Sequence, residues 1–113
     1  MANGLEIFDY TGEGYMPMID FESWRVAFLR YEPRFEHTTQ IERHMETDEV
    51  FVLLEGEATL LIGTEMTPCP MEKFKMYNVK KAVWHNIRVS KDARVLIVEN
   101  RDTTTENSEY MAV

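Results

Sequence analysis

Cysteine and long apolar runs are scarce in this sequence, and each absence excludes a class of protein. Cys69 is the single cysteine among 113 residues, so no internal disulfide can form and the reducing cytoplasm is the expected compartment. No apolar run approaches the ~20 residues of a membrane-spanning helix. The opening residues MANGLEIFDY lack the basic start and apolar core of a signal peptide. The sequence therefore predicts neither a membrane segment nor a secretory leader.

Positive charge is scarce as well. The chain has 12 Lys and Arg residues against 20 Asp and Glu residues, which gives a formal net charge of −8 at pH 7. No cluster of Lys and Arg forms the basic face that nucleic-acid binding requires. Anionic membrane surfaces would repel such a chain. We therefore expect a small-molecule ligand, with no nucleic acid and no membrane as partner.

The length suits one domain that spans residues 1–113. A domain of this size buries roughly two thirds of the surface that its unfolded chain exposes. Apolar residues make up 44% of the sequence, which is ordinary for a globular protein. One modest hydrophobic core is expected.

Short runs of β-branched and aromatic residues alternate with turns. We expect strands at 24–31, on both sides of a turn at Gly56 within 49–63, and at 74–79, 82–89 and 94–100. The stretch 67–71, TPCPM, contains two prolines and is expected to break the chain between strands. Helical periodicity is not clean anywhere, although 15–23 and 104–112 are compatible with a helix. The pattern predicts an all-β sandwich or barrel.

Two histidines and two glutamates stand out against this background. Glu42 and His44 are two residues apart, so an extended strand places them on one face. Glu49 returns after a short loop, and His85 lies on a later expected strand. Imidazole and carboxylate ligands suit Mn²⁺, Fe²⁺, Ni²⁺, Co²⁺ or Zn²⁺. The plainer alternative is a solvated charged stretch, together with a core histidine beside Trp84.

Two stretches together resemble the signature motifs of the cupin superfamily, namely ERHMETDEVFVLLEG (42–56) and YNVKKAVWHNI (77–87). The first cupin motif contains His-x-His, three or four residues, Glu, six residues and Gly. Here His44 falls at the second histidine, four residues separate it from Glu49, and six separate Glu49 from Gly56. His85 takes the histidine position of the second motif.

The sequence also departs from both motifs. Glu42 replaces the first motif histidine, and Glu36 replaces the leading glycine. In the second motif, other residues replace glycine, proline, glycine and asparagine, and these are Phe74, Lys80, Ala82 and Val89. A carboxylate can still bind a metal, so the resemblance implies two His and two Glu ligands instead of three His and one Glu. His37 is an alternative to Glu42, although no spacing rule favours it.

Cupins are double-stranded β-helix barrels whose inward motif residues hold one divalent metal. The resemblance therefore implies a jelly-roll barrel in which Glu42, His44, Glu49 and His85 hold a metal ion. It further implies isomerase, lyase or oxygenase chemistry on a small polar metabolite. Two alternatives stay open: a non-catalytic module that binds a sugar or small acid, and an interaction protein with a vestigial site.

Two further expectations concern the surface and the substrate. Because small cupins often pair through edge strands, the resemblance implies a homodimer. Arg25 and Arg30 have opposite parity on the expected strand 24–31. In one interpretation, one of them points inward and binds a substrate carboxylate, and in the other both arginines face solvent or a strand edge.

Overall fold

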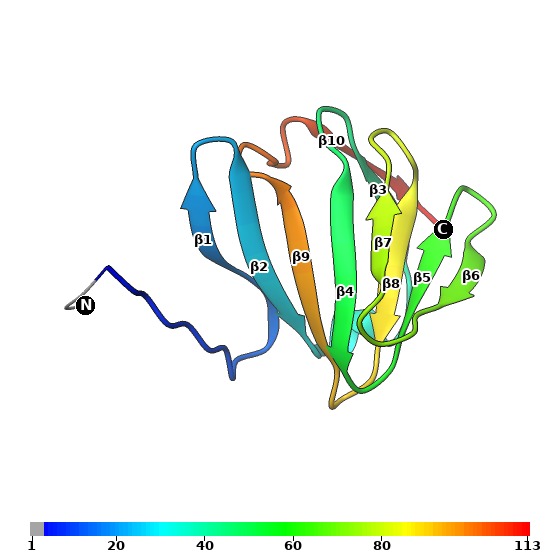
Figure 1. Cartoon of the computed structure of the whole chain (residues 1–113). Helices are drawn as coiled ribbons and strands as arrows, with labels where there is room; N and C mark the ends of the chain where they lie inside the picture. Colours follow the sequence, from blue (N-terminus) through cyan, green and yellow to red (C-terminus); the bar gives the residue numbers. More distant parts are fainter. Residues whose placement is uncertain (1–3) are drawn as a thin grey trace.

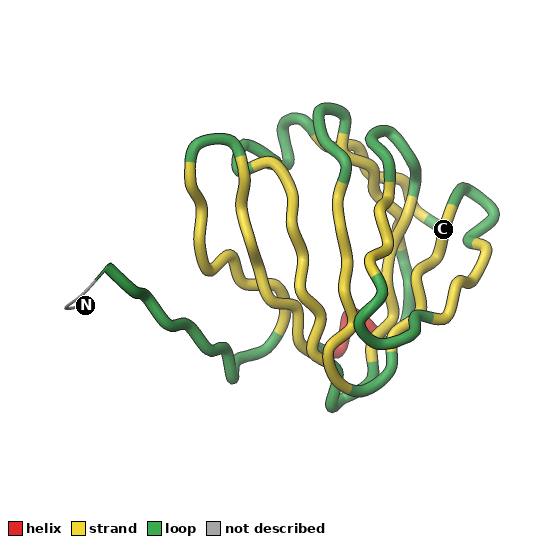
Figure 2. Tube along the Cα trace, viewed as in Figure 1, coloured by secondary structure: helices red, strands yellow, loops and turns green. Residues whose placement is uncertain are grey.

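Two antiparallel sheets face each other in this protein (Figures 1 and 2). The computed structural model describes residues 4–113, so the first three residues of the predicted domain and of the N-terminal stretch lie outside the described residues. Within the described chain, the helical structure is one short 3₁₀ helix, η1 (Pro33–Phe35). The all-β prediction is therefore confirmed. None of the described helical structure is long and apolar enough to cross a membrane.

The first sheet contains five strands in the order β1-β2-β9-β4-β7. The strands are β1 (Gly14–Phe21), β2 (Trp24–Arg30), β4 (Glu49–Glu55), β7 (Met76–Val79) and β9 (Arg94–Asn100). β9 lies at the centre, paired with β2 on one side and β4 on the other. The apolar run Val95–Val98 explains this central position, because a strand between two partners is best covered on both faces.

The second sheet also contains five strands, in the order β10-β3-β8-β5-β6. The strands are β3 (Gln40–His44), β5 (Ala58–Ile62), β6 (Thr67–Pro70), β8 (His85–Val89) and β10 (Ser108–Ala112). β8 is the central strand and joins β3 to β5. Gly56 makes the predicted turn with φ 72°, but β4 and β5 belong to different sheets, so this turn crosses between the layers.

The hydrophobic core fills the space between the sheets. Alternate residues of each strand point inward, so Phe51 and Leu53 of β4 are buried together with Val95 and Ile97 of β9. Each such side chain contributes roughly 1.5–3 kcal/mol when fully buried. Val50 pairs with Val98, and the next inward positions on these two strands, Glu49 and Glu99, are carboxylates. The alternation that directs the core side chains inward therefore also directs the carboxylates of Glu49 and Glu99 into the space between the sheets.

The expected break at 67–71 is wrong, and the helix left open for 15–23 or 104–112 is not formed in either stretch. The proline-containing stretch Thr67–Pro70 is strand β6, and it pairs with β5 alone. A proline is tolerated there because an edge strand leaves one side without ladder partners. The two stretches compatible with a helix form the edge strands β1 and β10, whose residues are mostly exposed and show little apolar alternation.

The strands expected at 74–79 and 82–89 begin later than predicted, at Met76 and His85. The cause is the left-handed backbone of Phe74 (φ 67°) and Ala82 (φ 65°), which interrupts the extended chain. Both residues occupy positions where the cupin motif has glycine. Phe74 and Ala82 thus keep the backbone conformation that favours glycine although each has a side chain, and this costs backbone strain.

Candidate functional site

All four residues predicted to bind a metal come together at one cavity. Glu42 and His44 lie on β3, Glu49 begins β4, and His85 begins β8. Glu42 stands directly opposite His85 in the ladder between β3 and β8. The side chains of all four residues line the same cavity.

A glutamate oxygen lies between the two imidazole rings. Oε1 of Glu49 is 3.1 Å from Nε2 of His44 and 3.0 Å from Nε2 of His85. The centroids of the two rings are 5.3 Å apart, and all three residues are buried. A carboxylate oxygen only accepts hydrogen bonds, so each of these contacts is a hydrogen bond when Nε2 carries a proton.

The other ring nitrogens fix the orientation of the histidines. Nδ1 of His85 donates to the carbonyl oxygen of Val83 at 2.9 Å. Nδ1 of His44 is 2.7 Å from the hydroxyl of Ser108, which can donate or accept. Both rings therefore direct Nε2 at Glu49. Metal-binding histidines are commonly held by such contacts at the nitrogen that does not bind the ion.

Burial and ion pairing act against each other at these groups. Burial alone would raise the pKa of Glu49, but hydrogen bonds from His44 and His85 outweigh it and lower the pKa well below the usual range. Burial alone would lower the pKa of both histidines, but the Glu49 carboxylate outweighs it and raises both above 6.5. The pKa of Glu42 is raised, because desolvation exceeds the attraction of the two histidines.

The cavity has a volume of about 340 Å³, within the range of small-molecule sites. Its apolar wall consists of Leu29, Phe35, Phe51, Ile87 and Ile97. Amide, hydroxyl and phenol groups line other parts of it, from Gln40, Asn86, Thr103, Thr104, Thr105 and Tyr110. A polar ligand of modest size would meet both surfaces.

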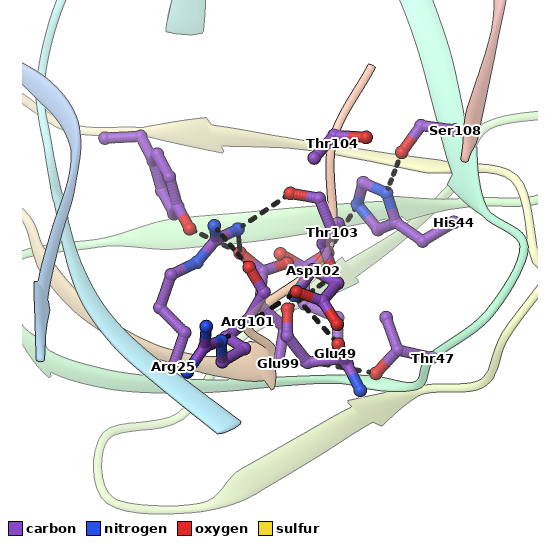
Figure 3. A network of polar contacts seen from close by, with 12 residues as sticks. Arg25, His44, Thr47, Glu49, Glu99, Arg101, Asp102, Thr103, Thr104 and Ser108 are labelled. Atoms are coloured by element: carbon purple, nitrogen blue, oxygen red, sulfur yellow. Dashed lines mark hydrogen bonds and ion pairs between the residues drawn. The ribbon is translucent and has the colours of Figure 1, made fainter. Parts of the chain in front are cut away.

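Glu99 is a cavity residue that the sequence motifs did not reveal. It lies on β9 and is 6% exposed. Its Oε1 accepts a hydrogen bond from Nη2 of Arg25 at 2.7 Å and another from the hydroxyl of Tyr15. Figure 3 shows Glu49 and Glu99 side by side between Arg25 and His44. One signal was present in the sequence: Glu99 has the same strand parity as the buried Val95 and Ile97.

Arg25 points inward and Arg30 does not. Arg25 pairs with Glu99 and also donates to the carbonyl oxygens of Arg101 and Thr103 at 3.3 Å. Arg30 donates to the carbonyl oxygen of Gly12, away from the cavity. The inward interpretation is therefore right for Arg25, although the carboxylate it binds belongs to this chain.

The spacing of the potential ligands fits a divalent metal ion. There are two groups of three residues in which the ligand atoms, one from each residue, all lie within 4.8 Å of one another. These groups are Glu42–His44–His85 and His44–Glu49–Glu99. Ligand atoms this close together can contact one ion. The separations of 3.0 and 3.1 Å around Glu49 Oε1 are hydrogen-bonding distances between the two histidines and the carboxylate. Imidazole and carboxylate are also the donors that the expected ions favour.

Two other residues considered from the sequence lie elsewhere. His37 follows η1 and lines a shallow depression with Glu57 and Arg88, outside the cavity. Cys69 lies on edge strand β6 opposite Leu60 and is a free thiol. Neither residue belongs to the site.

Comparison with solved structures places the fold. No protein-family model and no curated protein matches the sequence. A cupin-2 domain containing protein from Shewanella frigidimarina is similar with a TM-score of 0.63 and 19% identity, over 80% of this chain and 85% of that one. An RmlC-like cupin family protein with a double-stranded β-helix fold, from Methanocaldococcus jannaschii, has a TM-score of 0.62 and 13% identity, over 88% and 92%.

A third similar structure is Pac13 of Streptomyces, described as a nucleoside dehydratase. Its TM-score is 0.65 at 11% identity, over 95% of this chain and 92% of that one. Together with the two facing antiparallel sheets, these similarities show that this chain has the cupin fold, a double-stranded β-helix. The resemblance predicted from the motifs is confirmed at the level of the fold.

Proposed function

We propose that this chain is a cupin-fold metalloprotein that acts on a small polar metabolite. In this proposal Glu42, His44, Glu49 and His85 hold one divalent ion, which is Mn²⁺, Fe²⁺, Ni²⁺, Co²⁺ or Zn²⁺. The supporting observation is that these four side chains line one cavity of about 340 Å³, where Glu42, His44 and His85 offer ligand atoms within 4.8 Å of one another and Glu49 contacts both histidines.

The chain's own residues supply binding, orientation and proton transfer. A bound metal would supply Lewis acidity for an isomerase or lyase reaction, or redox activity for an oxygenase reaction. Phe51 and Ile97 exclude water from the inner wall, which strengthens the electrostatic interactions there. Glu42 is only partly buried and its pKa is raised, so we assign it the role of general base at the stage when its carboxylate has left the metal.

The substrate class follows from the size and lining of the cavity. Gln40, Asn86 and Tyr110 offer hydrogen-bonding groups to a hydroxylated or carboxylated molecule. Pac13, a neighbour in fold, is described as a nucleoside dehydratase and is known with uridine. Dehydration is an elimination, so this neighbour supports the lyase class and a small polar substrate for this chain.

A non-catalytic module that binds a sugar or small acid is the second candidate. The observation that favours it is the internal pairing of the site, because Glu49 accepts hydrogen bonds from both histidines and so already satisfies their Nε2 groups. The third candidate, an interaction protein with a vestigial site, has less support, because the cavity is not filled by side chains.

We also propose a homodimer in the cytoplasm. Edge strand β1 exposes Met16, Ile19 and Phe21, and Trp24 at the start of β2 lies against Phe21. A second copy would cover this apolar surface and the open strand edge. A monomeric mass in light scattering would contradict the dimer.

The proposed location in the cytoplasm rests on the free thiol of Cys69, which suits a reducing compartment.

Metal binding is tested by measuring metal content by plasma mass spectrometry after incubation with each of the five ions. The wild type is compared with His44→Ala, His85→Ala and the control His37→Ala, whose histidine lies outside the cavity. We expect one ion per chain in the wild type and the control, and loss of the ion in the other two variants. Equal metal content in all four proteins would contradict the proposal.

Catalysis is tested by a screen of nucleosides, sugars and small acids with metal-loaded and metal-free protein. An enzyme would turn over a compound only when loaded, and His44→Ala would abolish that turnover while its thermal unfolding stays cooperative. A compound that binds equally well without metal and is not converted would support the binding module instead.

A further inference from the structure

A third carboxylate lies beside the ligand cluster, on the same sheet as Glu49. Glu99 offers a ligand atom within 4.8 Å of those of His44 and Glu49, and all three residues are buried. Neither cupin motif contains this position. We infer that Glu99 is an additional metal ligand and that Arg25 and Tyr15 hold it in place, an inference that rests on the metal-binding function proposed above.

The register of the sheet places Glu99 beside Glu49. Val50 pairs with Val98 across β4 and β9, so Glu49 and Glu99 occupy the next position of the ladder and point to the same inward face. Two carboxylates brought together in a buried site repel each other unless a cation or a shared proton lies between them. A divalent ion bound by His44, Glu49 and Glu99 satisfies this requirement.

The hydrogen bonds of Glu99 suit the role of a positioned ligand. Arg25 and Tyr15 both donate to Oε1, so the second oxygen is not needed to hold the side chain in place. Arg25 is itself held by the carbonyl oxygens of Arg101 and Thr103. Carboxylate ligands are commonly oriented by such hydrogen bonds from outside the coordination sphere.

The charges of the site balance only when Glu99 is counted. Ionised Glu42, Glu49 and Glu99 carry three negative charges, Arg25 offsets one of them, and a divalent ion offsets the other two. Buried charge is tolerated when it is paired in this way. A site without the Glu99 carboxylate would leave one positive charge unpaired in the loaded protein, and its affinity for the ion would fall.

The test is the affinity of the metal-free protein for Co²⁺ and Zn²⁺, measured by competition with a chelator. Glu99→Gln keeps the shape of the side chain and an acceptor for Arg25, and we expect it to weaken binding about 10–100-fold. Glu109→Gln is the matched control, because Glu109 pairs with Arg43 on the exposed face of β10. The visible absorption spectrum of the Co²⁺ form should also change in Glu99→Gln, since it reports the loss of a ligand.

A second comparison of variants tests whether Glu99 binds the ion or only pairs with Arg25 in the fold. Tyr15→Phe should weaken Co²⁺ binding in the otherwise wild-type chain but have little further effect in Glu99→Gln, because the Tyr15 hydroxyl acts through Glu99 and carries no charge. If Glu99→Gln unfolds, Glu99→Asp replaces it, and its shorter carboxylate is expected to weaken binding as well.

The outcomes distinguish this inference from the proposed function. Wild-type affinity and an unchanged Co²⁺ spectrum in Glu99→Gln or Glu99→Asp, with binding lost in His44→Ala, would overturn the role of Glu99 alone. Absence of Co²⁺ and Zn²⁺ binding to the wild type, together with no uptake of Mn²⁺, Fe²⁺ or Ni²⁺, would overturn both the role of Glu99 and the proposed function.

Discussion

Metal binding to this site is expected to release more than one proton per ion at pH 6.5. A metal needs an unprotonated Nε2 on both His44 and His85. Glu49 Oε1 lies at hydrogen-bonding distance from both Nε2 atoms, which favours a proton on each. Incoming metal must therefore displace these protons.

The number of protons follows from the partners of the two rings. His85 donates from Nδ1 to the Val83 carbonyl, so a proton on Nε2 makes the ring an imidazolium, and one proton must leave it. The Nδ1 partner of His44 is the Ser108 hydroxyl, so His44 either loses a proton or moves it to Nδ1. Because both pKa values are raised above 6.5, each ring is more than half protonated at that pH. The sum exceeds one proton and approaches two at lower pH.

The assay is isothermal titration calorimetry of Zn²⁺ into metal-free protein at pH 6.5. Repeating it in buffers of different ionisation enthalpy gives the number of protons from the slope of the observed enthalpy. With two protons released, metal affinity should fall about a hundredfold for each unit of pH below the histidine pKa values.

Two variants identify the source of the protons. Glu42→Gln removes a carboxyl of raised pKa and should still release more than one proton. In Glu49→Gln the carboxylate is gone, so the pKa of both histidines should fall, which NMR of the metal-free protein measures directly. Release of less than one proton by the wild type at pH 6.5 would refute the reasoning, because the metal-free rings would then be mainly neutral.

Four other predictions concern stability. Leu53→Ala should lower the free energy of unfolding by about 2–5 kcal/mol in urea denaturation, because Leu53 is fully buried, and a smaller loss would contradict its place in the core. Ala82→Gly should leave stability unchanged or raise it by up to about 1 kcal/mol, since φ is 65°, whereas Ala58→Gly on β5 should lower it. Saturation with Zn²⁺ at about 100 times its Kd should stabilise the wild type by about 2.7 kcal/mol, and His44→Ala should show no such gain. The raised pKa values of His44 and His85 stabilise the metal-free fold below pH 6.5, and this contribution is lost as pH rises through the folded pKa values, so metal-free protein should be less stable at about pH 8 than at about pH 6. The opposite order would contradict the pairing with Glu49.

Strand β9 was predictable from its sequence, and the edge strands β1, β6 and β10 were not. β9 has the bounds expected from its apolar run, because a strand between two partners is apolar on both faces. β1 and β10 are each covered on one side only and expose most of their residues, so their sequences carry little apolar alternation. The two prolines of β6 led to the prediction of a break, but an edge strand tolerates proline.

The candidate site was predictable where it coincides with a motif. His44, Glu49 and His85 have cupin positions, and the fold brings them together with Glu42. Glu99 and Ser108 belong to no motif, and long-range strand pairing alone brings them to His44 and Glu49. The parity of β9 carried one signal for Glu99, but its apolar residues on both faces concealed which face is inward.

The most direct test of the central claim is anomalous X-ray diffraction from crystals of protein loaded with the ion found by metal analysis. The account predicts one anomalous peak per chain inside the cavity, at about 2.1 Å from Nε2 of both His44 and His85 and within bonding distance of Glu49. A cavity without an anomalous peak in crystals that contain the ion, or a peak away from these histidines, would contradict it.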